Sequence, residues 1–201
     1  MKKIPTLFKR EFEGHNIVRV LPELSDESLS WVLEGYGIAT VKYDGACCAI
    51  FDNKLYIRYD AKNGKPIPEN AIKCQEEADP VTGHLPCWIP YDENNKGQKW
   101  YKVAYDNFIQ SAKDDGLPLP PRDGTYEAIG KHFNGNMYNL DTDVLIRHGD
   151  DVIYACPRTF EGIRDYLKDN FIEGIVFWKD DEPKCKIKRS DFGFPWQEKH
   201  R

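Results

Sequence analysis

The sequence predicts an α+β fold rather than a doubly wound parallel sheet. Segments with strand patterns and segments with helix patterns are intermixed along the chain, without the strict alternation that βαβ units require. The 201 residues are 40% hydrophobic and 13% aromatic, which supplies enough apolar surface for a packed core. We therefore expect a single domain over residues 1–201, with a helical lead-in at 1–35, a core at about 36–190 and an insertion-like loop at 79–99.

The first elements follow from cap and turn signals. Residues 25–35 predict a short helix, because a serine or aspartate can cap its start and a glycine stands at its end. The segments at 36–51 and 54–60 predict two consecutive strands. The dipeptide Asp52-Asn53 between them predicts a hairpin turn.

The middle of the chain is dominated by breaker residues. Residues 68–77 predict a helix with a proline near its start, and 79–99 are rich in Gly, Pro, Asn and Asp, which is typical of a long surface loop. A helix is expected from 106 to 113. Residues 116–124, GLPLPPRDG, predict an extended connector because prolines do not fit inside a helix.

The last third predicts strands around one helix. The helix spans 157–170, with Thr159 as its cap and an apolar stripe along one side. Strand patterns lie at 123–130, within 144–154, at 172–178 and at 184–188.

Charge and hydropathy limit the classes of protein. The formal net charge of −5 argues against a large non-specific nucleic-acid surface, although it leaves room for a local basic groove. No apolar run approaches the roughly 20 residues that span a bilayer. The basic start of the chain is not followed by the apolar segment of a signal peptide. We expect a cytoplasmic protein without a membrane anchor.

The six cysteines predict reduced thiols rather than a disulfide framework. Cys47 and Cys48 are adjacent in a predicted strand, so their side chains point to opposite faces and do not bond each other. A zinc site at Cys74, His84 and Cys87 is an alternative, but no CxxC pair supports it.

The string KYDG, Lys42 to Gly45, is the first candidate for chemistry. Strand alternation places Lys42 and Asp44 on one side, and Gly45 lets backbone or ligand approach closely. A lysine amine becomes a nucleophile when it loses its proton, which burial or neighbouring cations favour. A solvent-facing lysine on a strand is the simpler interpretation of this string alone.

The string GTYEAIG supplies a second candidate at Tyr126 and Glu127. Glu127 is flanked by apolar residues, so it is either an edge charge on a half-buried strand or a carboxylate that accepts a ribose hydroxyl, with Tyr126 as an aromatic neighbour.

Two further strings lie near the end of the chain. In EGIVFW, Glu173 precedes an apolar strand and is either a loop residue or a group that helps to hold a divalent metal ion. In KCKIK, the alternation places Lys184, Lys186 and Lys188 on one face of a strand. Such a row is either a solvated face or a set of cations that faces a triphosphate.

The order and spacing of these four strings resemble the covalent nucleotidyltransferase superfamily of ATP-dependent ligases and mRNA capping enzymes. KYDG is similar to motif I of that superfamily, IRYDAK with Arg58 to motif Ia, TYEAIG to motif III, EGIVFW to motif IV and KCKIK to motif V. Within it, the doubled cysteine after KYDG, the segment GHLPCWIPYDENNKGQKWY and the tail SDFGFPW most resemble the 5′-to-3′ RNA ligase group with a vertebrate member.

The resemblance covers residues 38 to 190 and implies a nucleotidyltransferase (adenylation) domain of antiparallel sheets flanked by helices, with 36–190 as its catalytic core and no OB domain. It implies that Lys42 takes AMP from ATP, that Lys186 and Lys188 neutralise the α-phosphate, and that Glu173 helps to hold Mg²⁺ or Mn²⁺. The residues that it implies in nucleotide binding are Val41, Asp44, Gly45, Arg58, Lys62, Tyr126, Glu127 and Glu173.

One position departs from the superfamily pattern. Related ligases commonly carry glutamate where Val41 stands, so a side-chain contact near the base is missing and a preference for adenine is less secure. The implied partner is RNA with 5′-phosphate and 3′-hydroxyl ends, acted on by a monomer. The alternatives are a capping-type guanylyltransferase, a DNA ligase, or a protein that binds nucleotides or nucleic-acid ends without turnover.

Overall fold

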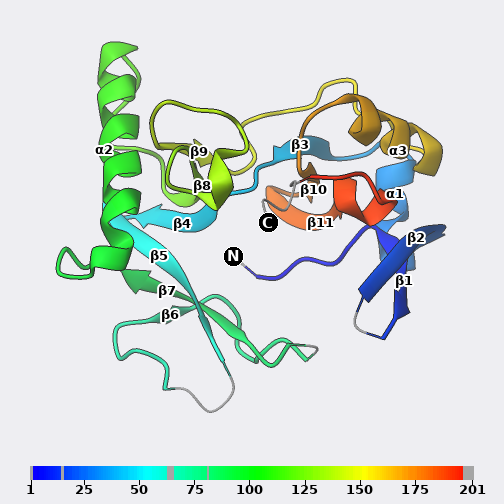
Figure 1. Ribbon diagram of the computed structural model, residues 1–201, viewed down its shortest axis with the longest axis horizontal. Coiled ribbons are helices and arrows are strands. Elements are labelled where there is room, and N and C mark those ends of the chain that lie inside the picture. The colour runs from blue at the N-terminus through cyan, green and yellow to red at the C-terminus, as the bar shows by residue number, and fades with distance from the viewer. Residues whose placement is uncertain (1, 15, 63–65, 81, 197–201) are drawn as a thin grey trace. The chain divides into compact units, whose positions relative to one another are not determined.

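The computed structural model describes residues 2–14, 16–62, 66–80 and 82–196. The chain forms two compact units (Figure 1). Unit 1 comprises Met1–Lys3 and Asp44–His148, and unit 2 comprises Ile4–Tyr43 and Gly149–Arg201. The chain thus leaves unit 2 within KYDG and returns after His148. A single domain over residues 1–201 stays a prediction.

Unit 1 is built on a six-stranded antiparallel sheet in the order β6-β7-β5-β4-β8-β9. Its strands are β4 (Ala46–Phe51), β5 (Lys54–Ala61), β6 (Ile72–Lys73), β7 (Leu85–Pro90), β8 (Gly124–Ile129) and β9 (Val144–Arg147). Its helices are η2 (Lys96–Gln98), α2 (Lys99–Asp114) and η3 (Asn134–Asn136).

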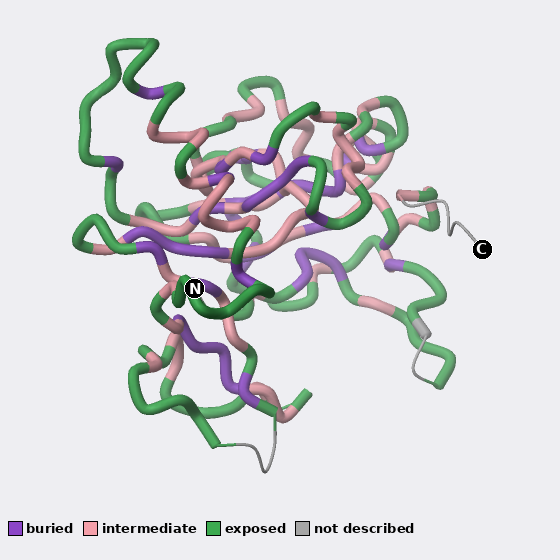
Figure 2. The backbone as a smooth tube through the Cα atoms, turned by 60° about the vertical axis from the view of Figure 1, so that its left-hand side comes forward, coloured by how far each residue is buried: buried purple, intermediate pink, exposed green. Residues whose placement is uncertain are grey.

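The long helix α2 packs on one face of this sheet (Figure 1). Ala104 from α2 and side chains of β4, β5, β8 and β9 form the main core of unit 1. Figure 2 shows buried residues along the strands and exposed residues along the connections. The half-buried polar side chains described below lie on the other face of the sheet.

Unit 2 holds a three-stranded antiparallel sheet in the order β11-β10-β3 and a separate hairpin of β1 and β2. Its strands are β1 (Phe8–Glu13), β2 (Asn16–Leu24), β3 (Ile38–Lys42), β10 (Gly174–Lys179) and β11 (Glu182–Lys188). Its helices are η1 (Glu27–Leu29), α1 (Ser30–Leu33), α3 (Phe160–Asp169) and η4 (Arg189–Phe192). Ile163 and Leu167 of α3 pack with Ile175, Phe177, Cys185 and Ile187 in its core.

Several sequence predictions are confirmed. The mixed helices and antiparallel sheets agree with an α+β fold. Asp52 and Asn53 both have positive φ, as a two-residue hairpin turn with the twist of its strands requires. The side chain of Thr159 accepts a hydrogen bond from the Gly162 amide and caps α3, and β8, β10 and β11 lie where they are expected.

The predicted helical lead-in at 1–35 is wrong for most of its length. Residues 8–13 and 16–24 form the β1–β2 hairpin, and among the described residues of this range only those of the short helices η1 and α1, at 27–33, are helical. The β-branched residues Ile17, Val18 and Val20 favour a strand, and Pro22 does not fit a helix interior.

The predictions for the middle of the chain are also corrected. The expected helix at 68–77 is absent; this segment contains the two-residue strand β6. The expected loop at 79–99 contains β7, whose apolar residues are largely buried. The helix expected at 106–113 begins at Lys99, so α2 is longer than predicted.

All six cysteines are free thiols, as expected, and Cys48 is buried while Cys47 is half-buried. Across the described ranges, no helix has both the length and the apolar character that crossing a bilayer requires.

Candidate functional site

The strand register of unit 2 brings Lys42 and Lys188 into one row across the sheet. Gly174 on the central strand β10 pairs with Lys42 of β3 on one side and with Lys188 of β11 on the other. Because glycine has no side chain, nothing on β10 separates the two lysines in this row. A side-chain carbon at Gly174 would overlap the carbonyl oxygen of Ile187, so the strands approach closely here.

Glu173 joins the two lysines. Its Oε2 lies 2.5 Å from the Nζ atom of Lys42, and its Oε1 lies 2.6 Å from the Nζ atom of Lys188. The Glu173 side chain is only 6% exposed, so both ion pairs are shielded from water on the carboxylate side. The structure thus brings together three residues that lie far apart in the sequence and were each predicted as part of the site.

Lys186 lies on the same face of β11 and pairs with Val176 across the sheet. Burial, together with the positive charges of Lys42, Lys188 and Arg10, lowers the pKa of Lys186 to about 8, while Glu173 opposes the shift. Arg10 is held by the buried carboxylate of Asp191, at 2.8 Å. The predicted alternation of KCKIK is confirmed, since Cys185 and Ile187 are buried on the opposite face.

The residues that flank Lys42 differ in orientation. Val41 pairs with the core residue Ile175, so strand alternation places its side chain on the face opposite to Lys42. The hydroxyl of Tyr43 donates to Asp151 at 2.6 Å, and burial together with this bond raises the pKa of Tyr43. Strand β3 ends at Lys42, so the strand alternation expected to relate Lys42 to Asp44 does not reach Asp44.

In unit 1, Asp44 and Gly45 are held by three residues of that unit. The Asn134 side-chain amide donates to the Asp44 carboxylate and to the Gly45 carbonyl oxygen, each at 2.8 Å. The Asp44 amide donates to the Tyr138 hydroxyl, and the Gly45 amide to Glu127. A side-chain carbon at Gly45 would overlap the carbonyl oxygen of Ala128, which explains the glycine.

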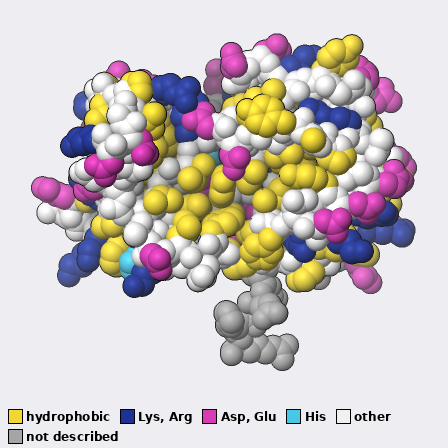
Figure 3. All heavy atoms as spheres, turned by 90° about the horizontal axis from the view of Figure 1, so that it is seen from above, with side chains coloured by type: hydrophobic (Ala, Val, Ile, Leu, Met, Phe, Trp, Pro, Cys, Tyr) yellow, Lys and Arg dark blue, Asp and Glu magenta, His cyan; other side chains and the backbone are white. Residues whose placement is uncertain are grey.

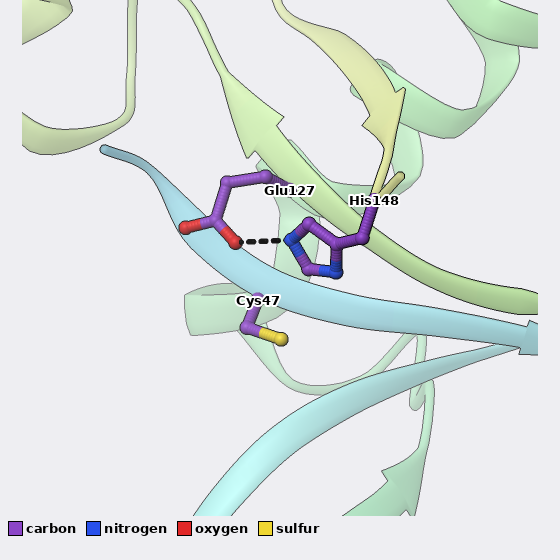
Figure 4. A group of neighbouring side chains, drawn as sticks. All are labelled: Cys47, Glu127 and His148. Carbon is purple, nitrogen blue, oxygen red and sulfur yellow. Dashed lines mark hydrogen bonds and ion pairs between the residues drawn. The ribbon is translucent and has the colours of Figure 1, made fainter. Parts of the chain in front are cut away.

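Glu127 lies in a polar group on the face of the unit 1 sheet that α2 does not cover. Its Oε2 lies 2.9 Å from Nε2 of His148, and its register partner on β4 is Cys47 (Figure 4). Burial, together with the charge of Glu127, raises the pKa of the Cys47 thiol to about 12. Sequence reasoning missed His148, since only the pairing that holds it beside β8 reveals its role.

Arg58 is close enough to Cys47 for its charge to oppose this pKa shift. Its Nε donates to Asp60 at 2.8 Å, and its guanidinium lies over the Trp88 ring. Lys62 is exposed just after the end of β5. Both residues belong to unit 1. Arg58 lies within β5, and Lys62 follows the end of the same strand.

Tyr126, which the resemblance implies in nucleotide binding, does not lie on the face that carries Glu127. Tyr126 is 1% exposed and lies in the core of unit 1 against Phe108 of α2. Its hydroxyl donates to the carbonyl oxygen of Arg122. Adjacent residues of a strand point to opposite faces, so Tyr126 enters the core while the half-buried Glu127 lies on the other face of the sheet.

The zinc site considered at Cys74, His84 and Cys87 is not formed. Among the residues that the structure describes, the one group of three Cys, His, Asp or Glu side chains with donor atoms close enough for a metal ion is Cys47, Glu127 and His148. Cys87 is buried, and its thiol faces the carbonyl oxygen of Leu85.

Charge on the surface is mixed. On the face shown in Figure 3, Lys and Arg side chains are interspersed with Asp and Glu side chains. This agrees with the net charge of −5. We call Lys42, Lys186 and Lys188, together with the bridging Glu173, the lysine cluster.

Comparison with known proteins points in one direction. Residues 60–201 match the model of a family described as RNA ligase 1. A Pongo abelii protein named RNA ligase 1 is 28% identical over 79% of this chain and 68% of its own length. Proteins of the same name from Danio rerio and Rattus norvegicus are 30% and 27% identical, over 69% and 97% of this chain and 46% and 82% of their own lengths. The residues matched by the family model include Glu127, Glu173, Lys186 and Lys188. Lys42 precedes that range, but the match to the Rattus norvegicus protein, over 97% of this chain, includes it.

Proposed function

Because this chain belongs to the RNA ligase 1 family, we propose that it is an ATP-dependent RNA ligase that works through AMP bound covalently to Lys42. The observation that carries the proposal is the lysine cluster of unit 2, in which Glu173 bridges the candidate nucleophile Lys42 and the cation Lys188. A solvated strand face would not need a buried carboxylate between two lysines.

In the first step, the neutral amine of Lys42 attacks the α-phosphorus of ATP. A bond forms between Nζ and phosphorus, the bond from phosphorus to the bridging oxygen breaks, and pyrophosphate leaves. The ammonium must first lose a proton to water. Lys186 and Lys188 place further positive charge on the same side of the sheet as the attacking amine.

Lys186 and Lys188 also supply electrostatic stabilisation. Negative charge accumulates on the phosphate oxygens as pyrophosphate departs, and cations fixed by strand β11 are in place before the reaction. The side chains need little reorganisation because their strand is paired along its length with β10.

The residues present fit a Mg²⁺ or Mn²⁺ ion that arrives with ATP. Such ions prefer oxygen ligands and are held in nucleotide sites by one or two carboxylates together with phosphate oxygens and water. Glu173 offers one carboxylate, and engaging it would release Lys42 from its ion pair. The ion would add positive charge at the phosphates as they leave.

The resemblance assigns the sugar and end contacts to residues that belong to unit 1. Glu127 would accept a hydrogen bond from the ribose, Asp44 would order the KYDG segment, and Arg58 and Lys62 would contact the sugar or the incoming 5′-phosphate. Val41 would contribute its backbone alone, because its side chain lies on the face opposite to Lys42 and gives no contact of the kind that a glutamate gives. This assignment corresponds to a nucleotidyltransferase fold.

The remaining steps complete the strand. AMP passes from Lys42 to the 5′-phosphate of RNA, which forms a new phosphoanhydride and frees the amine. A 3′-hydroxyl then attacks that 5′-phosphorus, AMP leaves, and a phosphodiester bond remains. We propose that a monomer does this in the cytoplasm.

The test is incubation with Mg²⁺ and ATP labelled at the α-phosphate, followed by denaturing electrophoresis. We expect a labelled band that disappears in Lys42→Ala. The matched control is Lys184→Ala, since Lys184 lies on the same strand but pairs with the exposed residue Glu182. A labelled Lys42→Ala protein would refute the assignment of the nucleophile.

The same assay separates the alternatives. Label from GTP alone would identify a capping-type guanylyltransferase, and no label from either nucleotide would identify a binding protein without turnover. Once label is found with ATP, joining of 5′-phosphorylated RNA and DNA strands of one sequence distinguishes an RNA ligase from a DNA ligase.

A further inference from the structure

Cys47, Glu127 and His148 form a cluster of three different donor groups on the face of the unit 1 sheet opposite to α2. A sulfur, a carboxylate oxygen and a ring nitrogen all lie within 4.8 Å of one another. Figure 4 shows the three side chains gathered over β4 and β8. All three residues are half-buried, so the donors are partly removed from water and still reachable.

The sheet register builds this cluster. Cys47 of β4 pairs directly with Glu127 of β8, so their side chains leave the sheet on the same face. His148 follows β9, and its amide donates to the carbonyl oxygen of Thr125 on β8. Backbone pairing thus fixes all three positions, while the neighbouring Cys48 faces the core.

We propose that Cys47, Glu127 and His148 form a binding site for a thiophilic divalent transition-metal ion, with Zn²⁺ as the best fit. Zinc takes thiolate, imidazole and carboxylate ligands, whereas Mg²⁺ takes oxygen. A thiolate and a carboxylate together balance the charge of a divalent ion. Three protein donors leave a fourth position for water, which is typical of an open, exchangeable site.

The histidine ring is already oriented for this role. Its Nδ1 lies 2.8 Å from the Thr125 hydroxyl, an orienting contact of the kind that metal-binding histidines use. Its Nε2 faces Glu127 at 2.9 Å, and the ion enters between these two donors. Tetrahedral zinc separates such donors by about 3.3–3.6 Å. The ion therefore enters with only a small movement. The Cys47 thiol releases its proton to water, and the neutral ring keeps one proton on Nδ1, beside the Thr125 hydroxyl.

The site has a consequence for the reaction, and this part depends on the proposed function. Glu127 is the proposed ribose acceptor, and its oxygen nearest His148 is the one that the metal takes. Bound zinc therefore competes with the nucleotide for Glu127 and slows the formation of lysyl-AMP. The bound metal ion would thus inhibit adenylation reversibly.

Metal binding is tested first on the full chain, without nucleotide, by titration with Co²⁺ and measurement of its thiolate charge-transfer absorption. We expect about one equivalent to give this absorption in the wild type and in Cys74→Ser, a matched cysteine of unit 1. Cys47→Ser and Cys47→Ala should lose the absorption and bind at least about tenfold more weakly. Circular dichroism and the thermal midpoint show that the variants are folded.

Absence of the thiolate absorption in the wild type, or its persistence in folded Cys47→Ser, would overturn the site. The second measurement adds Zn²⁺ to the AMP-labelling reaction with Mg²⁺ in excess. Zinc should inhibit the wild type and Cys74→Ser, and Cys47→Ser should label normally and resist inhibition. Equal inhibition of Cys47→Ser would refute the proposal that zinc inhibits labelling by binding at this site. Absence of label without zinc would refute the proposed function and leave the Co²⁺ result to decide the metal site.

Discussion

Lys186 is the residue whose charge state responds most to its position in the lysine cluster. Burial and three neighbouring cations lower its pKa to about 8 from the ordinary 10.5. Between these two pH values the unfolded chain binds the proton and the folded chain does not, so this lysine makes the protein more stable as the pH rises from about 8 to 10.5. Below pH 8 the folded state carries the full cost, at most about 3 kcal/mol.

Lys186→Met should therefore stabilise the protein at neutral pH while it slows AMP labelling. We expect a gain on the order of 1–3 kcal/mol in the free energy of unfolding at pH 7, and a much smaller gain at pH 10. Urea unfolding at both pH values measures it. Lys184→Met, on the same strand beside exposed Glu182, serves as control. A gain that is equal at the two pH values would contradict a lowered pKa.

At this scale, spacing predicted some orientations and not others. The period of KCKIK was enough to place Lys186 and Lys188 on one face, because alternation is a property of the strand itself. By the same rule, the adjacent residues Tyr126 and Glu127 point to opposite faces of β8. The resemblance had assigned both of them to nucleotide binding. His148 and Asn134 carry no local signal, since their partners lie more than 20 residues away.

The packing of strand β10 against β11 requires a glycine at position 174. At Gly174 a side-chain carbon would overlap backbone atoms of Ile187 and Lys188 on β11, and backbone cannot turn aside as a flexible side chain can. Gly174 also lies in the row between Lys42 and Lys188.

Gly174→Ala should therefore push β11 away from β10. We expect a loss of about 2–4 kcal/mol in the free energy of unfolding, together with a loss of AMP labelling. The control is Gly116→Ala, which meets open space and bears only the strain of its positive φ, about 1 kcal/mol. Denaturant midpoints of the two variants measure the difference. Equal midpoints would show that the β10–β11 spacing adjusts freely.

Elements were predictable where the signal was local. Thr159 marked the start of α3, and the pair Asp52-Asn53 marked the β4–β5 turn, because caps and tight turns are decided by the residues within them. Strand β7 was missed because prolines at 86 and 90 suggest a loop, whereas pairing with β5 and β6 stabilises the segment between them.

The division into two units is a property of the whole molecule that the sequence did not reveal. Unit 1 is inserted between the two parts of unit 2, and the first crossing falls inside KYDG, where no linker composition marks it. Long-range pairing, such as β3 with β10, assembles unit 2 from segments on either side of this insertion. A local pattern cannot show which distant strand completes a sheet.

The distribution of charge over the molecule bears on how the RNA substrate of the proposed function would be held. Acidic side chains outnumber basic ones, 33 to 28, and the two kinds are interspersed on the face in Figure 3. Binding of RNA ends should then depend on a few fixed cations rather than on a broad basic surface. Each phosphate contacted on a single strand contributes a slope of about −0.7 to the dependence of log K on log salt.

We therefore expect a 5′-phosphorylated single-stranded RNA to bind with a slope of about −2 to −3.5, which corresponds to roughly three to five phosphate contacts. The matched RNA with a 5′-hydroxyl lacks the terminal phosphate, so its slope should be shallower by about one contact. Fluorescence anisotropy at several salt concentrations measures both slopes. A slope of about −6 or steeper would require many distributed cations, and the proposal that RNA is held mainly by its end would then fail.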